Sequence, residues 1–112
     1  MQITDLSVLV TGGVSGMGKA AAQWLTELGA KVTLVDLDDA RVKSIADELN
    51  CQGIACDVTD AKSVERALLD IKNQQGIPRV CVHCAGIIYA KRVAGRSGPM
   101  PLEDFQKVIN VN

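Results

Sequence analysis

A glycine-rich segment holds the residues whose spacing points most clearly to chemistry. Thr11 is followed by Gly12, Gly16 and Gly18, between an apolar run and a helical apolar pattern. Glycine lets backbone N–H groups approach a pyrophosphate, and a helix N-terminus adds partial positive charge. The residues expected to contact the phosphates of a dinucleotide are Gly12, Ser15, Gly16, Met17 and Gly18. The alternative is a tight turn that uses glycine for conformational reasons alone.

A carboxylate lies about 20 residues past these glycines, at the end of the next apolar run. Asp36 can there accept hydrogen bonds from the adenosine ribose hydroxyls, and its charge would repel a 2'-phosphate. Ser15 occupies the loop position where a basic side chain would serve NADP. Both positions predict NAD as the cofactor, with Leu37 in the same site. The alternative is that Asp36 belongs, with Asp38 and Asp39, to a solvated turn and helix cap.

The cysteines suggest a second, competing chemistry. Four cysteines occur at positions 51, 56, 81 and 84, and His83 lies between the last two. A zinc or redox site at Cys81 and Cys84 is a remote alternative, because zinc modules use cysteines three apart. In a strand, however, residues three apart point to opposite faces. We expect reduced core cysteines, no metal site, and His83 as a core or near-surface residue.

Tyr89 and Lys91 are a further pair of reactive residues. They lie two apart in an expected loop, so they do not share a helix face as a tyrosine and lysine four apart would. We do not expect them to form an acid–base pair.

Apolar runs alternate with helical patterns along the chain, which predicts β-α-β units and a parallel sheet. The expected strands are residues 7–11, 31–36, 54–56 and 80–84. The helical residues expected to be buried are Met17, Ala20, Ala21, Trp24, Leu25 and Leu28, then Val42, Ile45, Ala46 and Leu49, then Val64, Ala67, Leu68 and Ile71. The expected helix-terminating and capping residues are Gly29, Asp38 or Asp39, Asn50 and Asp60. A long loop through Gly95 and Gly98 then leads to a helix from Leu102.

Length and composition suit one soluble domain of 112 residues, with 47% hydrophobic and 22% charged residues. The formal charge is −1 and no run of like charges occurs, so nucleic acid and anionic membrane are poor candidate partners. The first residues show no basic leader, and their apolar run stops at glycine well below the length of a membrane span. We expect a cytoplasmic protein.

Taken together, these segments resemble the short-chain dehydrogenase/reductase family. TGGVSGMG, residues 11–18, matches that family's T-G-x-x-x-G-x-G loop. Asp57-Val58 resembles its adenine-contacting pair, and His83-Cys84-Ala85-Gly86 is similar to its Asn-Asn-Ala-Gly segment. The resemblance implies a Rossmann-type doubly wound α/β fold, of which the N-terminal half has strand order 3-2-1-4. It also implies cofactor contacts at Asp57, Val58, Cys84, Ala85 and Gly86.

Within that family, residues 83–112 are similar to the type-2 3-hydroxyacyl-CoA dehydrogenases. This resemblance implies hydride transfer between NAD and a secondary alcohol or ketone, such as a 3-hydroxyacyl thioester, by a homo-oligomer. Asn112 aligns with the catalytic asparagine of the family's Asn-Ser-Tyr-Lys tetrad.

We therefore expect residues 1–112 to be an NAD-binding domain truncated before the catalytic Ser and Tyr-x-x-x-Lys. On its own this domain is expected to be inactive. An alternative keeps the fold without the enzyme, as an NAD-binding fragment or interaction module.

Overall fold

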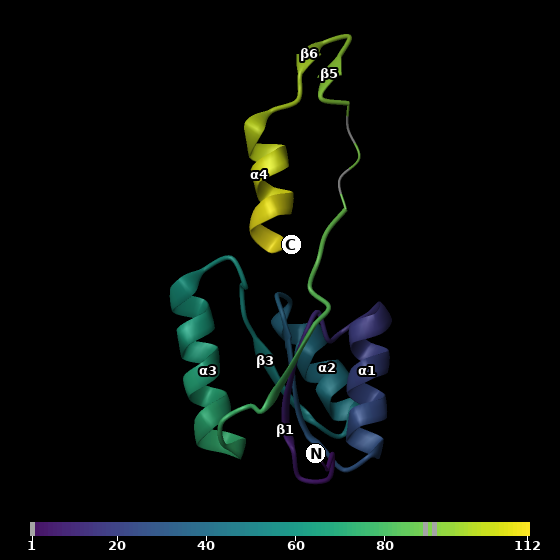
Figure 1. Cartoon of the computed structure of the whole chain (residues 1–112), viewed down its shortest axis with the longest axis vertical. Helices are drawn as coiled ribbons and strands as arrows, with labels where there is room; N and C mark the ends of the chain where they lie inside the picture. Colours follow the sequence, from purple (N-terminus) through teal and green to yellow (C-terminus); the bar gives the residue numbers. More distant parts are fainter. Residues whose placement is uncertain (1, 89, 91) are drawn as a thin grey trace.

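A computed structural model of the chain describes residues 2–88, 90 and 92–112 (Figure 1). The main strands are β1 (Ser7–Thr11), β2 (Lys31–Asp36), β3 (Gln52–Ala55) and β4 (Val80–His83). The helices are α1 (Gly16–Glu27), α2 (Asp39–Leu49), α3 (Ala61–Gln75) and α4 (Leu102–Val111). A short hairpin pairs β5 (Ala94–Gly95) with β6 (Gly98–Pro99). Tyr89 and Lys91, the pair set aside as an acid–base pair, lie outside the described residues.

The four main strands form one parallel sheet in the order β3-β2-β1-β4, which confirms the predicted topology. Val8 of β1 lies opposite Val32 of β2 and Val80 of β4. The helices α1 and α2 cover one face of the sheet and α3 covers the other (Figure 1). Both faces of the central strands are therefore apolar, as expected for a parallel sheet covered on both sides.

The helix ends follow the local chemistry of their capping residues. The side chain of Asp38 accepts a hydrogen bond from Arg41 N at the start of α2, and Asp60 accepts one from Lys62 N at the start of α3. Asn50 ends α2 in the left-handed conformation, and Gly29, with φ of 89°, follows α1. These predicted termini are confirmed.

The prediction that Trp24 lies in the core was wrong. Trp24 is 60% exposed and Met17 is 82% exposed, and Leu28 is exposed as well. The buried residues of α1 are Gly18, which has no side chain, and Ala22, whose side chain is a methyl group, so this helix can lie close to the sheet. The bulkier stripe on the adjacent helix face, with Ala20, is left facing solvent.

A groove beside β4 explains a second difference from the expected core. Leu68 of α3 is 42% exposed, although Ala67 and Ile71 on the same helix are buried. Leu68 lines a groove of about 920 Å³ between α3 and β4, the edge strand of the sheet. Its helical spacing predicts an inward-facing side chain, but no described element covers that part of the sheet.

Two strand boundaries differ slightly from the expected ones. The strand β3 begins at Gln52 and ends at Ala55 because these residues pair in register with Thr33 and Asp36 of β2. The strand β4 ends at His83, one residue earlier than predicted.

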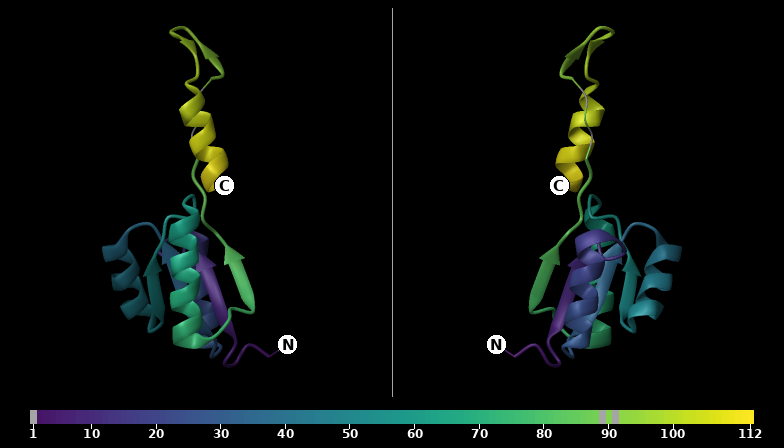
Figure 2. Two further views of the ribbon diagram at one scale, coloured as in Figure 1. Left: turned by 90° about the vertical axis from the view of Figure 1, so that its left-hand side faces the viewer. Right: turned by 90° about the vertical axis from the view of Figure 1, so that its right-hand side faces the viewer.

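The hairpin and α4 project beyond the carboxyl-terminal edge of the sheet and form an arm, residues 92–112 (Figure 2). The molecule measures 54 × 29 × 26 Å along its principal axes. The helix α4 has no buried residue, and Phe105 and Ile109 are exposed. Within the described residues, no helix is long and apolar enough to cross a membrane.

Candidate functional site

The glycine-rich loop between β1 and α1 is packed against the segment that follows β4. A Cβ atom at Gly12 would lie 2.7 Å from the backbone of Cys84 and Ala85, and one at Gly18 would clash with the carbonyl oxygen of Gly12. Gly12 and Gly16 both have positive φ, 66° and 54°. A Cβ at Gly16 would meet open space, so this glycine borders a cavity rather than a packed neighbour.

That cavity, of about 510 Å³, lies at the carboxyl-terminal edge of the sheet. The structure brings all twelve residues that the sequence assigned to cofactor binding to its walls. They are Gly12, Ser15, Gly16, Met17, Gly18, Asp36, Leu37, Asp57, Val58, Cys84, Ala85 and Gly86. Parallel α/β sheets bind ligands at this edge, where the strand order reverses.

The N-terminus of α1 faces this cavity. Ser15 is the N-cap residue, and its side chain makes no capping hydrogen bond. The first N–H groups of a helix have no partner within the helix and carry partial positive charge. The arrangement therefore suits an anionic group placed at the loop.

Asp36 is the last residue of β2, so it lies at the same carboxyl-terminal edge of the sheet as the cavity. One of its carboxylate oxygens accepts a hydrogen bond of 2.8 Å from Leu37 N. The backbone around it is tied to both neighbours, because Gly12 N donates to Val35 O and Cys56 N donates to Asp36 O. The carboxylate is thus held on the cavity wall by a strand end whose backbone is hydrogen-bonded on both sides.

Asp57 is fixed by its own turn. Its Oδ1 accepts hydrogen bonds from the Thr59 hydroxyl, at 2.6 Å, and from Thr59 N, at 2.9 Å. The side-chain bond to Thr59, followed by the backbone bond, lowers the pKa of Asp57 below 3.8. Asp57 N in turn donates to Ser63 Oγ at 3.0 Å. The neighbouring Val58 is thereby positioned on the cavity wall.

Asn112, which the sequence predicts to be a catalytic asparagine, ties the end of α4 to the segment that follows β4. Its Oδ1 accepts from Ile87 N at 2.8 Å, and its Nδ2 donates to Ile87 O at 3.1 Å. Asn112 lines the groove beside β4 rather than the loop cavity. In this structure it positions the segment after β4.

The cysteines do not gather into one site. Cys81 lines the groove between β4 and α3, whereas Cys84 lines the loop cavity, so the two thiols lie on different sides of the strand. All four cysteines are free, and within residues 2–88, 90 and 92–112 no three potential metal ligands cluster. The expectation of core cysteines holds for Cys56, which is buried, but was wrong for the exposed Cys81. An edge strand that nothing described covers leaves its outward residues in solvent.

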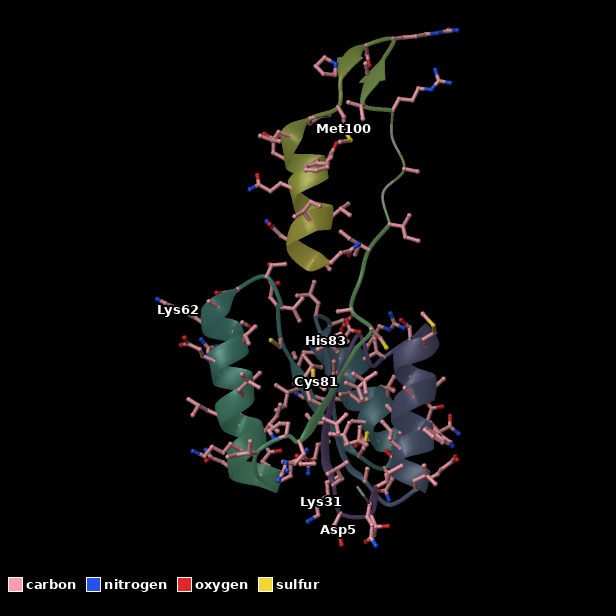
Figure 3. All side chains as sticks on the ribbon, viewed as in Figure 1. Asp5, Lys31, Lys62, Cys81, His83 and Met100 are labelled. Carbon is pink, nitrogen blue, oxygen red and sulfur yellow. The ribbon has the colours of Figure 1, made fainter. Side chains whose placement is uncertain are left out.

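His83 lies near the surface on β4, beside Cys81 (Figure 3). Its Nδ1 is 3.8 Å from Cys81 Sγ, and its side chain borders the groove rather than the loop cavity. Although Cys81 is exposed, neighbouring protein atoms exclude some water from its thiol, and this desolvation raises the pKa of Cys81. Burial likewise raises the pKa of Cys51 to about 11, although a hydrogen bond with Thr26 opposes this effect. These thiols are therefore not activated as nucleophiles.

Sequence reasoning missed the contribution of the arm to this cavity. Lys107 and Val111 of the arm also line it, and so do three residues outside the arm, Val35, Cys56 and Ile87. Lys107 and Val111 are four residues apart and share one face of α4. The spacing of Lys107 and Val111 predicts that they share a helix face, but only the contact between Asn112 and Ile87 shows that this face of α4 is turned toward the cavity.

Comparisons with known proteins show which sequences and structures this chain resembles. Residues 12–112 match the sequence model of a family described as enoyl-(acyl carrier protein) reductase. The 3-hydroxyacyl-CoA dehydrogenase type-2 of Drosophila melanogaster is 42% identical over 93% of this chain and 42% of its own length. The Bos taurus protein of the same name is 40% identical over 98% of this chain and 44% of its own length. The chain thus spans less than half the length of these curated relatives.

A solved structure shows the same fold. A short-chain dehydrogenase from Mycobacterium smegmatis superposes with a TM-score of 0.89 at 26% sequence identity. The match covers 98% of this chain and 47% of that one.

Proposed function

Because the chain belongs to the short-chain dehydrogenase/reductase family, we propose that it binds NAD in the cavity between the 11–18 loop and α4. The observation that carries the proposal is the gathering of the loop, Asp36 and the Asp57-Val58 pair around one cavity. Gly16 fits the phosphates, because its Cβ position is open space at the N-terminus of α1.

The preference for NAD over NADP rests on two side chains. Asp36 lies at the end of β2, where its carboxylate can accept hydrogen bonds from the ribose hydroxyls and repel a 2'-phosphate. Ser15 offers no positive charge at the loop. Both residues line the cavity.

We extend the proposal to the whole protein as an oxidoreductase that acts on a secondary alcohol or ketone. The bound nicotinamide would supply the hydride chemistry. The residues of this chain would bind and orient the dinucleotide, and Asn112 would hold the segment after β4 through Ile87. A 3-hydroxyacyl thioester is the proposed substrate class because the relatives are named as 3-hydroxyacyl-CoA dehydrogenases. We also propose that the whole protein is a homo-oligomer in the cytoplasm.

For residues 1–112 alone, the proposal is binding without turnover. The sequence has one tyrosine, Tyr89, and the residue four positions later is Val93 rather than lysine. Residues 1–112 therefore hold no tyrosine and lysine four apart, the pair that would supply a general base matched to a hydroxyl substrate.

The experiment is a calorimetric titration of the chain with NAD and with NADP. We expect NAD to bind more tightly, and the Asp36→Ala variant to narrow the difference. The lost charge-assisted contact corresponds to about 1.5 to 3 kcal/mol. Asp70→Ala on α3 removes an exposed carboxylate elsewhere and should leave the preference unchanged. Equal affinities of the unaltered chain for both cofactors would refute the role of Asp36.

A further inference from the structure

Lys107 occupies an unusual electrostatic position. Among the described residues it is the one basic side chain that lines the loop cavity, and it reaches that cavity from α4. Lys107 also borders an adjoining groove with Leu37, Asp57 and Thr59. Lys107 therefore shares one cavity with the glycine-rich loop and lies next to the part of its wall that holds Asp57.

The other charges of the cavity are negative. Asp36 and Asp57 line it, and both face the space that Lys107 borders. Lys19, the basic residue closest in sequence to the loop, is held by Glu48 of α2 at 3.1 Å. Without the positive charge of Lys107, the two phosphates of a dinucleotide would enter a cavity whose charged side chains are all acidic. In a partly enclosed site such charges interact more strongly than in bulk water.

Lys107 is available for this role. Its ammonium group makes no salt bridge or hydrogen bond with any of the described residues. Glu103, one turn earlier on α4, borders the adjoining groove but not the cavity. The face of α4 that carries Lys107 and Val111 lines the cavity. Two hydrogen bonds hold the end of α4 in this orientation, because Asn112 Oδ1 accepts from Ile87 N and Asn112 Nδ2 donates to Ile87 O.

We propose that Lys107 is a cofactor-positioning residue whose ammonium group attracts the diphosphate of the dinucleotide and offsets the charges of Asp36 and Asp57. This inference rests on the proposed function and adds a contact from the arm to those of the loop. It makes α4 the second wall of the dinucleotide site. The affinity for the diphosphate then depends on how α4 is held.

The test compares Lys107→Gln with the unaltered chain by calorimetric titration with ADP-ribose and with NAD. We expect Lys107→Gln to bind both ligands about tenfold more weakly at low salt, as loss of one charge-assisted contact predicts. The difference should shrink at high salt, because the interaction is screened. Lys107→Arg should restore most of the affinity. Lys31→Gln is the matched control, since Lys31 lies at the opposite end of the sheet (Figure 3).

The outcomes separate the two proposals. If the unaltered chain does not bind NAD, the proposed function itself fails. If it binds NAD and Lys107→Gln binds equally well at low salt, only the role of Lys107 fails. A parallel titration with NADP gives a further check. If Lys107→Gln lost affinity for NADP alone, the inference would also be overturned, because the lysine would then serve a 2'-phosphate. Circular dichroism of each variant verifies that the sheet and helices are retained.

Discussion

Two glycines of the loop are expected to fail for different reasons when each is changed to alanine. At Gly18 the new Cβ would clash with the carbonyl oxygen of Gly12 and lie 3.2 Å from the Cβ of Cys84. At Gly16 the new Cβ would have nothing within 4 Å, but φ is 54°. The first change disturbs packing between loop, helix and sheet, whereas the second places a methyl group at the edge of the cavity.

The magnitudes follow from these contacts. Alanine in a helix is favoured over glycine by about 1 kcal/mol, but overpacking against backbone costs about 1 to 3 kcal/mol or more. Because the clash at Gly18 involves the backbone of Gly12, whose N–H donates to Val35 O of β2, we expect Gly18→Ala to lower the free energy of unfolding by about 2 kcal/mol. Gly16→Ala should lower it by only about 1 kcal/mol, the cost of a left-handed alanine.

Urea denaturation and NAD titration together separate these effects. Gly16→Ala should keep a cooperative unfolding transition while its NAD affinity falls by more than about tenfold, because the methyl group occupies the space of a phosphate. Gly18→Ala should lose both stability and affinity. If Gly18→Ala were as stable as the unaltered chain, the close-packing argument would be wrong. If Gly16→Ala bound NAD normally, the phosphate would not lie where we place it.

Two further changes test the contacts that hold the site. Asn112→Ala removes both hydrogen bonds to Ile87. The backbone amide hydrogens of α4 should then exchange faster with solvent, and the free energy of unfolding should fall by about 1 kcal/mol. The control variant Asn110→Ala should change neither the exchange rates nor the free energy of unfolding. Thr59→Ala should raise the pKa of Asp57 in an NMR titration, since both effects that lower it come from Thr59, chiefly its hydroxyl. Because the pKa of Asp57 is lower in the folded than in the unfolded chain, its carboxylate stabilises the fold above pH 3.8, and this stabilisation should disappear as the pH falls through the folded-state pKa. An Asp57 pKa that is the same in Thr59→Ala as in the unaltered chain would refute the role of Thr59.

The topology and the loop could be predicted from sequence because their signals are local. Apolar runs define the strands, and Asp38, Asn50 and Asp60 mark helix ends through bonds to residues close in the chain. The twelve cavity residues follow strand ends, and parallel strands bring those ends to one edge of the sheet.

What could not be predicted depends on which face of a helix meets which neighbour. In α1 the spacing offers two apolar stripes, and only the close approach at Gly18 and Ala22 decides against Trp24. In α3, Leu68 has inward spacing but no described neighbour over the groove beside β4. Lys107 is distant in sequence from the loop it faces, and its position depends on the contact between Asn112 and Ile87.

NAD is proposed to bind in the cavity between the 11–18 loop and α4. An NMR titration of the isotope-labelled chain with NAD tests this proposal directly, because each backbone amide reports its own surroundings. We expect saturable shifts at residues 12–18, 36–37, 57–58 and 84–86, with little change at the opposite end of the sheet around Lys31. Saturable shifts confined to the groove between α3 and β4, or no shifts at millimolar NAD, would contradict it.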